Sequence, residues 1–229
     1  MTIPAADSRL VWDLPVRVTH WVLVFAVAGC WATHYAGVEW FDWHRRLGYV
    51  APVLVAFRIV WGFVGTRHAR FANFVRGPRT LLAYLRERGR ATVGHNPVGA
   101  LSVLALLALL LLQAVTGLFA NDEIMNMGPF YGWIAPELSN RITSLHRASS
   151  EWLLVLIGLH LAAVAFYVRV RRQPLVSAMV TGLKPASGVP AVEAITGSRV
   201  LLACAIVAVL AVALALAVRA APEATIALY

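Results

Sequence analysis

The chain has 229 residues, of which 60% are hydrophobic, with a mean hydropathy of +0.72 and a formal net charge of +9. Soluble domains are less apolar than this, and two cysteines are too few for a disulfide framework or a zinc motif. The positive charge is concentrated in particular loops between apolar runs, which argues against a nucleic-acid-binding protein.

Five apolar segments have the length needed to cross a hydrocarbon core of about 30 Å. The composition therefore predicts an all-α integral-membrane helical bundle. Four spans would lie in residues 1–185, and a linker and a fifth, C-terminal transmembrane helix in residues 186–229. The expected spans cover about residues 18–36, 44–64, 98–120, 146–168 and 200–218.

The first connections carry aromatic and basic signals. Pro15 suits the first turn of a helix, where its missing N–H costs little. The following "GVEWFDWH" is rich in tryptophan, which favours the headgroup level of a bilayer. In the next loop, "GPRTLLAYLRERGR" is typical either of an amphipathic helix on the membrane surface or of a solvated basic loop.

The distribution of positive charge predicts the orientation. Residues 65–97 carry seven arginines, and the segment after the fourth span is also basic, whereas the alternate loops are poor in positive charge. Positive loops stay in the cytoplasm. We therefore expect a multi-pass membrane protein with its N-terminus in the cytoplasm and its C-terminus outside. The loop arginines are Arg67, Arg70, Arg76, Arg79, Arg86, Arg88 and Arg90.

The seven histidines fall into levels along the expected spans. His20 and His160 lie in the inner half of the membrane, whereas His44 and His146 lie in the outer half with His34 nearby. His68 and His95 are expected on the surface of the basic loop. The fourteen residues from His146 to His160 keep both rings on one helix face, about 21 Å apart.

Histidines at matched depths need a common explanation, because ionisable groups inside a bilayer are costly and mark function. Two imidazoles on facing helices can hold the iron of a planar macrocycle through its axial positions. His20 with His160 would form an inner site. His146 would form an outer site with either His44 or His34, and spacing alone does not decide between them.

Six motifs spread over residues 10–185 resemble the bacterial cytochrome b561 family, which includes the b-type membrane subunits of nickel hydrogenases. The family takes one haem ligand from its first helix, one from its second and two from its fourth. The resemblance thus implies two haem b groups, with iron ligands His20 and His160 inside and His44 and His146 outside. It also implies a four-helix di-haem core, outside which the fifth helix lies, in the bacterial cytoplasmic (inner) membrane with a periplasmic C-terminus. The motifs are "LPVRVTHW", "HRRLGYV", "FRIVWGFVGTRHARF", "GHNPVGALSVLALLALLLLQAVTGL", "LHRASSEWLLVLIGLH" and "AMVTGLK".

Arginines and glycines near these histidines have two interpretations each. Arg17, Arg45 and Arg147 are candidates for contacts with anionic haem propionates, or are interfacial arginines that reach toward headgroups. Gly48, Gly117 and Gly158 either give a flat macrocycle room or serve plain helix packing.

The predicted function is electron transfer across the membrane by a di-haem b-type cytochrome. The expected partners are lipid, a quinone or quinol, and an outer-side c-type cytochrome or redox-enzyme subunit, with a bound quinone as a further candidate cofactor. Asp122, Glu123 and Glu137 in the second outer loop suit docking to a basic partner. Quinone oxidoreductase activity and assembly as a homodimer or a larger complex stay open. The alternatives are a histidine-dependent metal-ion transporter and a non-redox membrane anchor.

Overall fold

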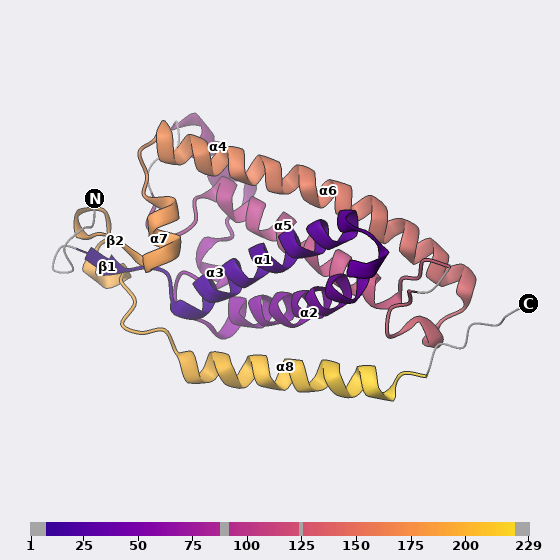
Figure 1. The fold of residues 1–229 in the computed structure, drawn as a ribbon. Helices are drawn as coiled ribbons and strands as arrows, with labels where there is room; N and C mark the ends of the chain where they lie inside the picture. Colours follow the sequence, from indigo (N-terminus) through magenta and orange to yellow (C-terminus); the bar gives the residue numbers. More distant parts are fainter. Residues whose placement is uncertain (1–7, 88–91, 124–125, 223–229) are drawn as a thin grey trace, which may run out of the picture. The chain divides into compact units, whose positions relative to one another are not determined.

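The computed structural model describes residues 8–87, 92–123 and 126–222, so Arg88 and Arg90 of the basic loop lie outside the described residues. Five helices are long and apolar enough to cross a membrane (Figure 1), which confirms the all-α membrane bundle predicted from composition. They are α1 (Leu14–Ala36), α2 (Phe41–Val64), α5 (Pro97–Phe119), α6 (Pro136–Arg169) and α8 (Val200–Ala220).

The fourth long helix differs from its predicted bounds. We expected it to begin at His146, but α6 begins at Pro136, which places His146 well inside the helix. Its first ten residues are too polar to read as a membrane span. They remain helical because two of their hydroxyls, on Ser139 and Thr143, are buried in hydrogen bonds with the preceding loop.

The contacts divide the chain into two compact units, and each long helix contributes one part to each of them. Unit 1 consists of residues 1–20, 58–106 and 156–204. Unit 2 consists of residues 21–57, 107–155 and 205–229. Each predicted histidine pair therefore falls within a single unit, His20 with His160 in unit 1 and His44 with His146 in unit 2.

A two-stranded antiparallel sheet in unit 1 joins the N-terminal lead to the segment after α6. Strand β1 (Ser8–Leu10) pairs with β2 (Leu183–Pro185), so that Arg9 lies opposite Lys184. Helix α7 (Leu175–Thr181) ends in Gly182, whose φ of 85° favours glycine. The Gly182 carbonyl accepts the N–H groups of Val11 and Trp12 and so fixes the entry to α1.

Short helices complete unit 1. They are α3 (Phe71–Phe74), α4 (Pro78–Arg86) and two 3-10 turns, η4 (Ala186–Gly188) and η5 (Ala191–Glu193). Helix α4 confirms the helical reading of the basic loop. One end of α4 is tied to α6, because the Tyr84 and Tyr167 hydroxyls lie 3.1 Å apart in a hydrogen bond.

The loop between α5 and α6, in unit 2, is folded by hydrogen bonds and aromatic stacking. The Asn121 side chain donates to the Ser139 hydroxyl at 2.6 Å and to the Asn140 carbonyl oxygen at 2.8 Å. Phe130 stacks on Trp133 of the 3-10 turn η3 (Tyr131–Trp133), with ring centroids 4.4 Å apart. Asp122 and Glu123 were expected to face a partner. They accept hydrogen bonds from Asn126 of the same loop and from Asn140 of α6, respectively.

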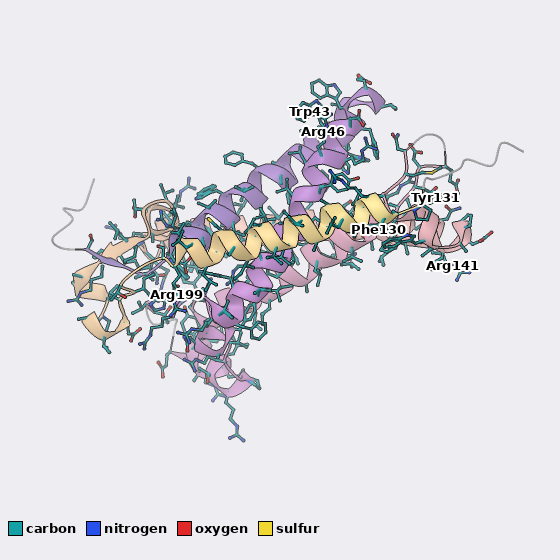
Figure 2. All side chains as sticks on the ribbon, turned by 90° about the horizontal axis from the view of Figure 1, so that it is seen from below. Trp43, Arg46, Phe130, Tyr131, Arg141 and Arg199 are labelled. Atoms are coloured by element: carbon teal, nitrogen blue, oxygen red, sulfur yellow. The ribbon has the colours of Figure 1, made fainter. Side chains whose placement is uncertain are left out.

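The connection between α1 and α2 is a short 3-10 turn, η2 (Val38–Trp40), and its aromatic residues are exposed. Trp43, in the first turn of α2, carries the Arg46 guanidinium 5.3 Å from its ring centre (Figure 2). An exposed tryptophan beside a cation suits the headgroup level. Large apolar side chains are also exposed along α8, including Leu201 and Val209, as expected for a helix that faces lipid.

Candidate functional site

Helices α1 and α6 bring two histidines together in unit 1. His20 lies in the second turn of α1 and His160 lies near the end of α6. Both side chains are half-buried, and the two imidazoles are near enough to interact electrostatically. The structure therefore brings together the two residues that the sequence placed at the inner level.

In unit 2, His44 lies in the first turn of α2 and is half-buried. Its Nδ1 lies 2.9 Å from the Cys30 carbonyl oxygen of α1. A carbonyl only accepts, so Nδ1 carries the proton and donates, and Nε2 is left as a lone-pair donor. The Phe41 ring stacks on the imidazole with centroids 5.6 Å apart and fixes its plane.

His146 of α6 is held by α5 in the same way. Its Nδ1 lies 3.1 Å from the Gln113 carbonyl oxygen and 3.1 Å from the Thr116 hydroxyl. The Gln113 side-chain oxygen accepts the Ser149 hydroxyl at 2.5 Å, so its NH₂ group faces His146 Nε2 at 3.1 Å. Again Nδ1 is the protonated nitrogen and Nε2 the acceptor, and a metal at Nε2 would replace the Gln113 contact.

His34 remains close to this pair. Its ring centroid lies 6.3 Å from that of His44, and its ring is near enough to His44 and His146 to interact electrostatically with both. Unlike His44, which is half-buried, His34 is exposed. The structure thus brings His34, His44 and His146 together, but it orients His44 through a backbone carbonyl.

The three glycines differ in their surroundings. A Cβ on Gly117 would lie 3.0 Å from the Cε1 atom of His146, so glycine at this position lets the ring lie against α5. A Cβ on Gly48 or Gly158 would meet no atom within 4 Å. Gly48 follows His44 by one helical turn on the same face of α2.

The three candidate arginines have different partners. Arg17 lies one turn before His20, and its guanidinium donates to the Val180 carbonyl while its Nε is buried without a hydrogen bond. Arg45 forms a 2.8 Å ion pair with Asp42 on the exposed surface. Arg147 is exposed next to His146. Contacts with propionates stay a prediction for all three.

Unit 1 also holds a buried polar cluster that sequence reasoning missed. Asp13, only 1% exposed, accepts the Val16 backbone N–H at 2.7 Å, the Trp61 indole N–H at 3.2 Å and the Thr66 hydroxyl. Arg58, 7% exposed, interacts electrostatically with Asp13 and donates to the Ala69 carbonyl. An acidic residue just before the Leu-Pro that opens α1 was the available signal, since it is typical of a helix N-cap.

His68 and His95 are not surface groups, so that expectation was wrong. His68 is 7% exposed and donates from Nε2 to the Glu193 carbonyl at 2.8 Å. The rings of Trp12 and Phe74 pack on His95 with centroids 4.7 and 4.5 Å away. These partners are distant in sequence, so local composition gave no sign of them.

Burial lowers the pKa of both loop histidines. The pKa of His95 falls to about 3, because burial disfavours the charged ring and the positive charges of Arg58 and Lys184 act in the same direction. Burial also lowers the pKa of His68, although the bond to the Glu193 carbonyl acts against it. The pKa of Lys184 is lowered by burial as well, and its ammonium donates to the Val93 carbonyl at 2.8 Å. This part of unit 1 is a packed polar core.

The histidine pairs are suited to bis-imidazole ligation. In unit 2 both rings present an unprotonated Nε2 and donate Nδ1–H to the backbone, which is the usual arrangement of metal-bound histidines. Within the described part of the chain, three or more His, Cys, Asp or Glu side chains do not gather into a bare-ion site. The residues fit an iron held by two axial nitrogens, as in a six-coordinate haem.

Comparisons with known proteins find a matching family model and several relatives. The family model described as prokaryotic cytochrome b561 matches residues 11–182. A probable Ni/Fe-hydrogenase B-type cytochrome subunit of Azotobacter chroococcum mcd 1 is 26% identical over 208 residues, covering 75% of this chain and 86% of its own length.

Two further relatives carry the same description. The protein of Rhizobium leguminosarum bv. viciae is 27% identical and covers 77% of this chain and 88% of its own length. That of Rhodobacter capsulatus is 26% identical and covers 79% and 83%, respectively. No solved structure matches the chain.

Proposed function

Since the chain belongs to the prokaryotic cytochrome b561 family, we propose that this b-type membrane cytochrome holds two haem b groups and carries single electrons across the bilayer. The observation that carries the proposal is the pairing of half-buried histidines, once in unit 1 and once in unit 2. When bound, each haem supplies a one-electron iron couple.

The residues of the chain would hold and tune these groups. His20 and His160 would provide the axial nitrogens in unit 1, and His44 and His146 those in unit 2. The Cys30 and Gln113 carbonyls orient the unit 2 rings and make their Nε2 atoms more basic. If two imidazoles of the chain held each iron, the site would favour electron transfer over binding of a small molecule at iron.

Helix α6 would set the spacing of the two sites. It is continuous from Pro136 to Arg169 and carries one proposed ligand of each pair. His146 and His160 are fourteen residues apart, about 21 Å along the helix axis. One continuous helix would therefore carry a ligand of each haem.

The partners of the proposed electron transfer follow from the relatives and the orientation. The relatives are described as hydrogenase cytochrome subunits, so we propose an outer-side redox-enzyme subunit or c-type cytochrome at one end and a quinone or quinol at the other. The basic loops would lie in the cytoplasm of the bacterial inner membrane. Unit 2, with the folded loop between α5 and α6, would then face the periplasm.

A haem count tests this function directly. The full-length protein, purified from a membrane with ample haem supply, is expected to contain two haem b groups per chain and to show a sharp α-band on reduction. A redox titration followed at that band should need two one-electron steps. A colourless folded protein, as expected for a metal-ion transporter or a non-redox anchor, would contradict the proposal.

A matched pair of variants identifies the outer ligand. His44→Ala is expected to lower the haem content from two to about one, because the oriented Nε2 of His44 is lost. His34→Ala is expected to retain two haems, because the His34 ring is exposed. Haem quantification against protein concentration gives the answer, and the opposite pattern would assign the outer iron to His34 instead.

A further inference from the structure

A polar cavity of about 510 Å³ lies in unit 1 where α2 ends and α8 begins. Thr66 and Arg67 on its wall follow closely after Val64, the last residue of α2, and Arg199 immediately precedes Val200, the first residue of α8. Among the described residues that line it are three arginines and neither an aspartate nor a glutamate. No acidic side chain among these lining residues therefore neutralises the positive charge of the arginines.

Two of the three guanidinium groups are fixed by the backbone. Arg67 donates to the Val192 carbonyl at 3.2 Å, and Arg199 donates to the Val64 carbonyl at 3.1 Å. The Arg70 guanidinium makes no hydrogen bond or ion pair with the other described residues. Each arginine carries five N–H donors, so most donors at this cavity are available to a ligand. Two fixed guanidinium groups and one without a bond to the other described residues suit an anion with several oxygens, such as a phosphate.

The helix ends next to the cavity carry exposed apolar side chains, which suit contact with lipid acyl chains. Phe63 is 69% exposed at the end of α2, and Leu201 is 89% exposed at the start of α8. Because both helices are membrane spans, their ends lie near the level of the phospholipid headgroups. The arginines of the cavity are therefore expected at headgroup level, next to the ends of two helices that carry exposed apolar side chains.

We propose that Arg67, Arg70 and Arg199 bind the phosphate of an anionic phospholipid whose acyl chains lie against the ends of α2 and α8. The backbone conformation of Arg199 supports a specific placement of its side chain at the cavity. Its φ of 48° is left-handed, an uncommon conformation for a residue other than glycine. Figure 2 shows Arg199 at the end of the α8 ribbon where that helix begins. A bound lipid would attach the start of α8 to the end of α2.

Lipid retention by the haem-loaded, full-length protein tests the proposal. The protein is purified in mild detergent from vesicles of equal phosphatidylglycerol and phosphatidylcholine, and bound lipid is measured by mass spectrometry. We expect about one phosphatidylglycerol per chain to be retained in preference to phosphatidylcholine. Arg67→Gln and Arg70→Gln should each weaken the apparent affinity by about tenfold, because each removes a charge-assisted hydrogen bond.

The matched control is the double variant Arg79→Gln with Arg86→Gln. It removes the same charge from exposed positions of α4, outside the cavity, and should retain lipid like the unaltered protein. Equal retention by R67Q/R70Q and this control, or equal retention of the two lipids, would overturn the proposal. If the double cavity variant loses its haem spectrum, R70Q alone is used, since the Arg70 side chain makes no bond within the described structure.

A competition experiment with inorganic phosphate distinguishes a lipid headgroup from a soluble phosphate compound as the ligand. Titration of the delipidated protein with inorganic phosphate should give only weak binding, in the range of non-specific salt effects. At equal ionic strength, phosphate should displace no more bound phosphatidylglycerol than sodium chloride does. The lipid proposal would be overturned if millimolar phosphate, but not sodium chloride, displaced the bound phosphatidylglycerol and if R70Q abolished this effect of phosphate. The cavity would then be assigned to a soluble phosphate compound.

Discussion

Replacing His160 by alanine is expected to lower the haem content of the purified protein from two groups per chain to one. His160 would supply one of the two axial nitrogens in unit 1, and His20 alone does not fix a six-coordinate iron there. The residues proposed to hold the outer group, His44 and His146, belong to unit 2 and are untouched by the change. Pyridine haemochrome quantification and the reduced-minus-oxidised spectrum would measure the loss.

Leu161→Ala is the matched control for this variant. Leu161 is the next residue of α6 and is 60% exposed, so its truncation removes a similar volume from the same depth without touching the proposed ligand pair. It should retain both haems. Loss of both groups in a folded H160A protein would contradict two separate sites, and retention of both would exclude His160 as a ligand.

His160→Met gives a second readout of the same site. A thioether can replace the imidazole as an axial ligand, and methionine–histidine ligation raises the reduction potential. If His160 is a ligand, one of the two steps in a redox titration should move to higher potential in this variant while the other stays in place. An unshifted titration with both haems present would count against ligation by His160.

The long helices and the histidine levels were predictable from the sequence because both depend on local pattern. Apolar length identifies spans, and helix periodicity places His146 and His160 on one face. The predicted helix bounds were wrong where polar residues extend a helix beyond its apolar part, as at the start of α6. There, tertiary bonds to Asn121 stabilise a helical segment that its own composition does not mark as a span.

The buried polar core of unit 1 was not predictable because its partners are far apart in the chain. Asp13 meets Trp61 and Thr66 across 48 and 53 residues, and His68 meets Glu193 across 125. Charged and polar residues in a basic loop are usually solvated, so burial of His68 and His95 contradicts the local pattern. The linker after α7 is also tied to unit 1, since Ile195 donates to the Leu10 carbonyl. The division of domains at residue 185 stays a prediction.

Replacing Asp13 by alanine should give the largest loss of stability outside the haem ligands. The change removes the N-cap of α1 and the acceptor of the Trp61 and Thr66 donors, and it leaves buried Arg58 without this counter-charge. Breaking a buried charged network of this kind costs about 3–5 kcal/mol. For a chain of this size, we expect the thermal midpoint to fall by roughly 10 °C, measured by the loss of haem absorbance on heating.

Asp42→Ala is the control, because it removes a carboxylate whose ion pair with Arg45 is exposed. Exposed pairs contribute about 0–1 kcal/mol, so the midpoint should change little. Asp13→Asn separates the two roles of Asp13, since its amide oxygen can still cap α1 but carries no charge. A midpoint between those of D13A and the unaltered protein would divide the effect between cap and charge. If D13A melted like D42A, the buried network would contribute nothing measurable to the stability of unit 1.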